Sequence, residues 1–217
     1  MSSADAIAFV DWNSQSHAAI DRELRGTQEG ASRTLEYVGR VVGTALHSAC
    51  NETRFKVKLR IYYGFRKGFE ATEGRKAVIN ALTSADLAII SRRANVLIRD
   101  EFALGDTLLS ARPIRMHNAQ SCHLPNTFRR SISDNARFEE KMVDTALATD
   151  LVHAAHSDKK TWLLVLGEDD DLTPPIITAD SIRYGSESMV LLARKRPLAP
   201  FLKIEDLQCA PISQFKN

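Results

Sequence analysis

The chain has 217 residues, 44% of them hydrophobic, which is enough for one domain with a buried core spanning residues 1–217. Its 29 basic and 27 acidic residues leave a net charge of +2, which excludes a global basic field, so any polyanion binding must rest on local charge. The N-terminus lacks a signal pattern and no apolar run approaches about 18 residues, which predicts a cytoplasmic protein without a membrane partner.

The first half of the chain alternates strand-like with helix-like segments. Strands are predicted where short aliphatic, β-branched or aromatic runs end in a turn signal, and helices where apolar residues recur every three to four positions. In chain order we expect a strand over 6–11, a loop over 25–32, a helix over 33–50, a strand over 56–64, a helix over 73–85, and weaker strands over 87–90, 95–99 and 113–117.

The second half begins with a polar, irregular segment, which we interpret as a loop insertion around 111–136. It is followed by a helix over 137–156 and strands over 161–167 and 188–193. Between these two strands we expect a helix with Thr173 as N-cap, Pro174 at the first helical position and Gly185 just past its end.

Alternating strands and helices predict an α/β fold, a three-layer sandwich around a central, mostly parallel sheet. Sheets of this kind bind ligands outside the carboxyl ends of their strands. Asp11 and Asp169 both fall at such ends. The functional site is therefore expected there.

Four consecutive acids, residues 168–171, follow the strand predicted over 161–167. Two unit charges 4 Å apart repel by about 4 kcal/mol at an effective dielectric near 20, so clustered carboxylates favour a bound cation. In an extended segment only alternate side chains share a face, and we select Asp169 and Asp171 as the pair facing the site. The alternative is an exposed acidic loop.

One acid lies within the helix predicted over 137–156. At 100° per residue, Asp144 falls on the same stripe as Leu147 and Leu151, so it is predicted to point toward the core, where a charge needs a partner. Lys141 is one candidate partner, as an i, i+3 pair. Asp150 is either a second acid supporting the site or an ordinary solvated residue.

Three segments together resemble the NYN family, a branch of the PIN-like metal-dependent ribonucleases: FVDWN at 9–13, KMVDTALATD at 141–150 and LGEDDDLTPPI at 166–176. The motifs are short individually but occur jointly in the family's order. The matched positions are Asp11, Asn13, Lys141, Asp144, Asp150, Asp169, Asp171 and Pro174. The segment 26–135 matches only in coarse architecture. Trp12, Gly167, Glu168 and Leu172 depart from the family pattern, and the bulk of Trp12 would crowd a site beside it.

The resemblance implies a PIN-like fold and an endoribonuclease. Asp11, Asp144, Asp169 and Asp171 would hold Mg²⁺ or Mn²⁺, hard cations that favour carboxylate oxygens. Asn13, Lys141 and Asp150 would support these acids or face the substrate. RNA is implied more strongly than DNA, and a homo-oligomer or a regulatory protein partner is compatible with the family.

Four arginines of the polar segment, Arg112, Arg115, Arg129 and Arg130, are the candidate nucleic-acid contacts, because the planar guanidinium matches a phosphate bidentately. Their alternative role is that of an ordinary solvated loop. The three cysteines are too dispersed for a disulfide framework, although His117, Cys122 and His123 could form a zinc site with Cys50 or His47.

Two other functions are compatible with the sequence. A degenerate PIN-like domain would bind RNA or protein without cutting. Alternatively, DDDLT at 169–173 resembles the Asp-x-Asp-x-Thr motif of haloacid-dehalogenase-like phosphatases, whose first Asp is a nucleophile. That motif normally follows the first strand of its domain, whereas only 44 residues follow Thr173 here.

Overall fold

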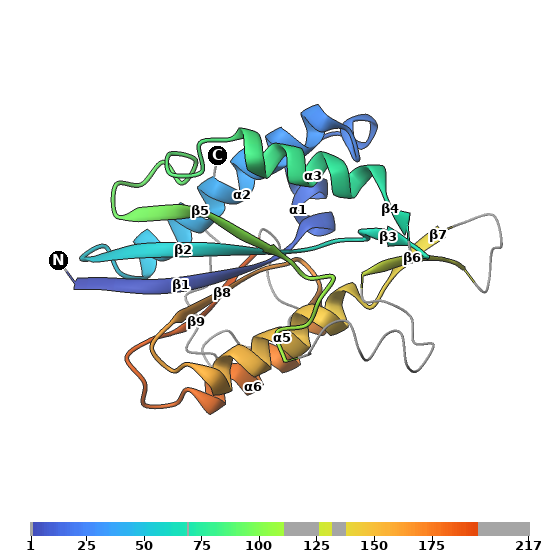
Figure 1. Cartoon of the computed structure of the whole chain (residues 1–217). Coiled ribbons are helices and arrows are strands. Elements are labelled where there is room, and N and C mark those ends of the chain that lie inside the picture. Colours follow the sequence, from blue (N-terminus) through green and yellow to red (C-terminus); the bar gives the residue numbers. More distant parts are fainter. Residues whose placement is uncertain (1, 69, 111–125, 132–137, 195–217) are drawn as a thin grey trace.

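Five parallel strands form the central sheet of the computed structural model, which describes residues 2–68, 70–110, 126–131 and 138–194 (Figure 1). In spatial order they are β5 (Val96–Leu104), β2 (Thr53–Tyr62), β1 (Ser2–Asp11), β8 (Trp162–Leu166) and β9 (Val190–Ala193). Each neighbouring pair runs parallel. The predicted α/β fold with a mostly parallel central sheet is therefore confirmed.

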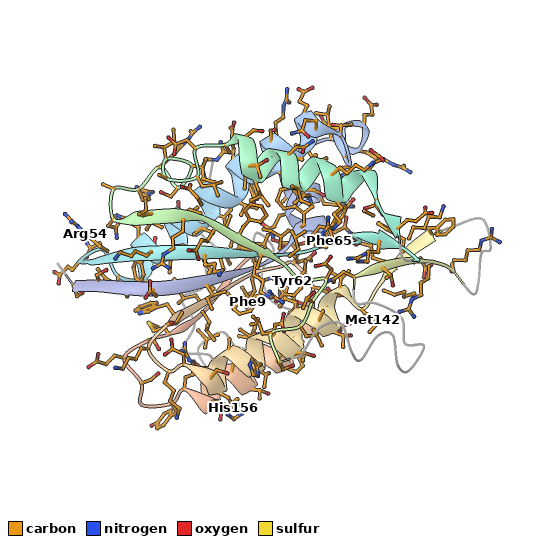
Figure 2. The ribbon with its side chains drawn as sticks, viewed as in Figure 1. Phe9, Arg54, Tyr62, Phe65, Met142 and His156 are labelled. Carbon is orange, nitrogen blue, oxygen red and sulfur yellow. The ribbon has the colours of Figure 1, made fainter. Side chains whose placement is uncertain are left out.

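Helices cover both faces of this sheet and make it the middle of three layers (Figure 1). One face carries α1 (Trp12–Ala19), α2 (Gln28–Ala49) and α3 (Glu73–Ser84), and the other carries α5 (Val143–Ser157) and α6 (Thr173–Ile182). Figure 2 marks Phe65, from the core on the α1–α3 side, and Phe9 and Tyr62, from the core on the α5 side. Burial on both faces explains why the strands read as continuous apolar runs.

The strand order changes direction between β1 and β8. From β1 the chain adds β2 and then β5 on one side, and it later returns to place β8 and β9 on the other. The carboxyl ends of β1 and β8 therefore diverge into connections on opposite faces of the sheet, which leaves a crevice where α/β proteins commonly bind ligands.

A second, mixed sheet, with both antiparallel and parallel strand pairs, lies beyond the carboxyl end of β2 (Figure 1). Its strands, in spatial order, are β4 (Glu70–Ala71), β3 (Arg66–Lys67), β6 (Thr127–Arg130) and β7 (Phe138–Lys141). Two predictions are wrong here. Part of the loop expected around 111–136 is strand β6, and the helix expected from residue 137 begins only at Val143, because β7 pairs with β6 and Met142 then adopts a left-handed backbone (φ 68°).

Other predicted boundaries also differ. Residues 28–32 belong to α2, whose N-cap Thr27 accepts a hydrogen bond from the Gly30 amide at 3.0 Å. Residues 87–90 form turns instead of a strand, the strand predicted over 95–99 extends to Leu104, and the strand predicted over 113–117 lies outside the described residues. The helix α1, which starts directly after β1, was not predicted.

The last helix begins differently from the prediction. A short 3₁₀ helix, η2 (Asp170–Leu172), leads straight into α6, so Thr173 is its first residue and Leu172 its N-cap. The helix ends at Ile182, and Gly185, with φ of 77°, closes the turn that follows. Across the described parts of the chain, every helix is too short or too polar to cross a bilayer.

Candidate active site

A pocket of about 740 Å³ opens at the carboxyl ends of β1 and β8. The first turns of α1 and α5, the end of β7 and the acidic run after β8 surround it. Its lining is Asp11, Asn13, Ser14, His17, Ala18, Glu140, Met142, Val143, Asp144, Glu168, Asp169 and Asp170. Half of these twelve residues are acids. Four predicted site residues, Asp11, Asn13, Asp144 and Asp169, are thus brought together from distant parts of the chain.

Asp11 is the most buried acid of the pocket, with 6% of its surface exposed. It is both the last residue of β1 and the N-cap of α1, where its Oδ1 accepts a hydrogen bond from the Ser14 amide at 3.3 Å. Burial raises the pKa of Asp11 to about 6; hydrogen bonds from Ser14 lower it, and the charge of Asp144 raises it. The cap holds the carboxylate in place where no cation of the described residues pairs with it.

Glu140 is a pocket acid that sequence reasoning missed. It lies in β7, and its Oε1 accepts a hydrogen bond from the Gly64 amide at 2.6 Å. Burial raises the pKa of Glu140 to about 7, the Gly64 hydrogen bond lowers it, and the charges of Asp11 and Asp144 raise it. No sequence signal pointed to this residue, because it was assigned to a helix.

Asp144 lies in the first turn of α5 and borders the pocket. Its side chain is exposed, so the prediction that it points along the apolar stripe toward the core is wrong. The first turn of the helix borders the open pocket, not the core. Partial burial raises its pKa, as do the charges of Asp169 and Asp171. Lys141 is not on the same helix. It lies in β7 and pairs with Glu139 at 2.9 Å.

The acidic run does not alternate as an extended strand would. Because η2 curls residues 170–172 into a 3₁₀ turn, Asp170, predicted to face away, lines the pocket. Asp171, predicted to face the site, is not among the lining residues and donates its amide to Asp169 Oδ1 at 3.0 Å. Arg194 reaches the run from the end of β9. Its guanidinium pairs with Asp170 at 2.7 Å and donates to the Glu168 carbonyl at 3.0 Å. One acid of the run is therefore neutralised by the protein itself.

Asp150 lies apart from the pocket, in a buried polar cluster. It is fully buried, which rules out the solvated alternative, and pairs with Arg60 at 2.6 Å. It also accepts hydrogen bonds from the Tyr62 hydroxyl at 2.8 Å and the Leu109 amide at 2.7 Å. These contacts join α5 to β2 and to the segment after β5.

The departures from the family pattern have local explanations. Trp12 does not crowd the pocket: it is 4% exposed and packs into the core on the side of α2. Gly167 ends β8 where a Cβ would lie 2.5 Å from the buried Leu172 side chain, so Gly167 and Leu172 form one packing unit. A Cβ at Gly167 would also lie 3.8 Å from Asp11 Cβ, so the acidic run begins close to Asp11.

Of the four candidate arginines, Arg112 and Arg115 lie outside the described residues. Arg129 and Arg130 lie in β6, where Arg129 contacts the Met142 sulfur at 2.9 Å and Arg130 is exposed. His117, Cys122 and His123 of the zinc hypothesis also lie outside the described residues, and His47 Nδ1 is within 2.8 Å of Asn95 Oδ1.

The described residues contain no group of three or more His, Cys, Asp or Glu side chains that already converge as metal ligands. The donor set nevertheless fits Mg²⁺ or Mn²⁺ chemically. It consists of carboxylates whose pKa values are raised by burial and by the charges of neighbouring acids, and Mg²⁺ commonly uses one or two protein carboxylates and keeps several waters. Comparison of the chain with models of protein families, with curated proteins and with solved structures finds no match.

Proposed function

We propose that this protein is a metal-dependent nuclease that hydrolyses phosphodiester bonds, with RNA as its substrate and the cytoplasm as its location. One observation supports the proposal above all. Asp11, Glu140 and Asp144 border a single pocket, where burial and the charges of neighbouring acids raise the pKa of each, and no ion pair with a described residue compensates them. Like charges gathered without a protein cation favour a ligand that is itself a cation. The preference for RNA rests on the family resemblance.

Asp11, Asp144 and Asp169 are the acids that would hold Mg²⁺ or Mn²⁺, and Asp171, whose charge acts on Asp144, would support them. When bound, such a cation supplies Lewis-acid activation of water and neutralises charge developing on the leaving oxygen. The α1 N-cap hydrogen bond keeps the Asp11 carboxylate directed at the pocket. The Gly64 amide does the same for Glu140 through Oε1. Asn13 lines the pocket, and its side-chain amide would donate a hydrogen bond to substrate.

A second candidate is a PIN-like module that binds RNA or protein without cutting. The observation in its favour is the spacing of the carboxylates, because no three of the described ones converge as ligands before a cation arrives. A phosphatase that uses Asp169 as nucleophile would need no contribution from Asp11 or Asp144. All three functions differ in what happens when single acids are replaced.

The decisive experiment compares Asp169→Asn with the parent on labelled single-stranded RNA and DNA, in Mn²⁺, Mg²⁺ or EDTA. We expect cleavage by the parent only with metal, and its loss in Asp169→Asn with the fold retained, because the isosteric amide lacks the charge that binds the cation. Asp100→Asn, which removes an exposed acid of β5, is the matched control and should cut normally. Undiminished cleavage by Asp169→Asn at saturating substrate, or cleavage in EDTA, would refute the proposal. Monoesterase activity that survives Asp11→Asn would favour the phosphatase.

A further inference from the structure

One face of the small sheet continues outward from the pocket. Residues opposite each other in paired strands share a face, and successive residues alternate. The register pairs Arg130 with Phe138, Phe128 with Glu140, and Lys67 with both Phe128 and Glu70. Phe138, Arg130 and Lys67 therefore lie on the same face as the pocket acid Glu140. Phe138 is two residues from Glu140 along β7, about 7 Å at strand spacing.

The outer part of this face combines an exposed ring with exposed cations. Phe138 leaves 39% of its surface exposed, and the Lys67 ammonium lies over its ring at 4.1 Å from the centroid. Arg130 is exposed beside them in β6. Neither Lys67 nor Arg130 forms an ion pair within the described part of the chain, even though Glu70 faces Lys67 across β3 and β4.

The opposite face of the same sheet is different. Lys141 is paired with Glu139 there at 2.9 Å, and Arg129 bonds to the Thr127 hydroxyl at 3.2 Å and to the Met142 sulfur. Its cations are occupied by neighbours in the sheet. Within the described part of the sheet, the two exposed cations that lie beside an exposed aromatic ring are therefore on the face that adjoins the pocket.

We propose that Phe138, Lys67 and Arg130 form a docking platform for an unpaired nucleic acid strand that leads into the acidic pocket. A base stacks on the Phe138 ring while Lys67 and Arg130 meet the phosphates on either side of it. An aromatic ring flanked by cations is the arrangement that captures single strands irrespective of sequence, because every base has a π-face and every linkage a charge. A duplex, whose bases are already stacked, cannot use the ring. The inference rests on the proposed function, since it supplies the substrate to that site.

The platform is tested by binding, measured by fluorescence anisotropy in EDTA so that no strand is cut. The probes are labelled oligouridine, oligothymidine and a blunt-ended RNA duplex. Phe138→Leu removes the ring but keeps an apolar residue, and Tyr184→Leu, at a residue 81% exposed after α6, is its control. Lys67→Ala with Arg130→Ala removes two cations, and Arg54→Ala with Lys56→Ala removes two exposed cations from the far end of β2 (Figure 2).

We expect Phe138→Leu to weaken binding of both single strands about 5- to 150-fold, the range for one base–aromatic stack, with an unchanged salt dependence and little effect on the duplex. The double cation variant should flatten the slope of log K against log salt by about 1.4, since each phosphate contact to a single strand contributes about 0.7. Both control variants should bind like the parent.

Three results would overturn the platform: equal binding by Phe138→Leu and Tyr184→Leu, an unchanged slope in the double cation variant, or no binding of any probe by the parent at low salt. The last would leave this face to a protein partner. The platform and the nuclease also fail separately. Tight binding that depends on Phe138, without any metal-dependent cleavage by the parent, would refute only the nuclease. Normal cleavage and binding by Phe138→Leu would refute only the platform.

Discussion

Helix α5 carries two aspartates whose surroundings are opposite. Asp150 is fully buried, yet Arg60, Tyr62 and the Leu109 amide satisfy its carboxylate within 2.6 to 2.8 Å. Asp144, six residues earlier, faces Asp11, Asp169 and Glu140, and no cation among the described residues joins them. The carboxylate of Asp150 therefore has a full set of partners, whereas the charge of Asp144 is not compensated by a cation of the described residues.

The difference separates structural charge from functional charge. A buried carboxylate with a full set of donors stabilises the packing of its element, and it has no capacity left for a ligand. Acids held close together without a counter-ion cost stability in the unliganded protein, which natural sequences retain mainly at functional sites. Burial alone would have indicated Asp150 as the functional acid of α5. The lack of a compensating cation among the described residues indicates Asp144 instead.

The largest effect is expected from a substitution that removes Asp150 from its buried cluster with Arg60 and Tyr62. Asp150→Ala leaves the Arg60 guanidinium buried without its partner and should destabilise the fold by about 3–5 kcal/mol. Asp144→Ala, on the same helix, removes an exposed acid from among like charges and should change the free energy of unfolding by less than about 0.5 kcal/mol, or raise it slightly. Urea unfolding of both variants in EDTA measures the contrast. Equal losses in the two variants would show that the two ends of α5 do not differ as argued.

A smaller effect should appear in the pH dependence of the unliganded protein. The pKa of Asp11 is raised in the folded state from 3.8 to about 6, so the folded protein binds more protons than the unfolded chain between these values. Stability is therefore expected to fall as pH rises from about 4 to 6, by about 3 kcal/mol for a shift of about two units. Glu140, with a pKa raised from 4.5 to about 7, extends the same loss to neutral pH.

Asp11→Asn isolates this contribution, because Asn caps a helix as well as Asp and carries no charge. In EDTA the variant should be more stable than the parent at pH 8 and no more stable at pH 4. Chemical unfolding at the two pH values measures it. A variant that is equally destabilised at both would mean that Asp11 serves mainly as a cap and not as one of a set of competing charges.

The sequence predicted the three layers of the fold and three of the six acids that line the pocket, for different reasons in each part. Continuous apolar runs at 161–167 and 188–193 report burial on both faces, so the parallel sheet and the positions of Asp11 and Asp169 at strand ends were accessible. Glu140 was not, because β7 is four residues long and its pairing partner β6 belongs to a segment with almost no strand signal. Arg194 was missed because the acid it neutralises, Asp170, is presented by a 3₁₀ turn that an alternating pattern cannot reveal.

The smallest expected effect comes from adding a cation to the uncompensated acids at the start of α5. A cation that binds only the folded protein stabilises it by RT ln(1 + [L]/Kd), about 1.4 kcal/mol at ten times Kd and about 2.7 at a hundred times. We expect millimolar Mn²⁺ to raise the melting temperature at pH 7.5, and Asp144→Ala to lose most of that rise, whereas Asp100→Asn should keep it. Thermal unfolding at matched ionic strength measures all three. An equal rise in Asp144→Ala and the parent would place the metal elsewhere. If the rise depends on Asp144, the bound cation compensates the acid at one end of α5 as Arg60 compensates Asp150 at the other, except that the cation can dissociate.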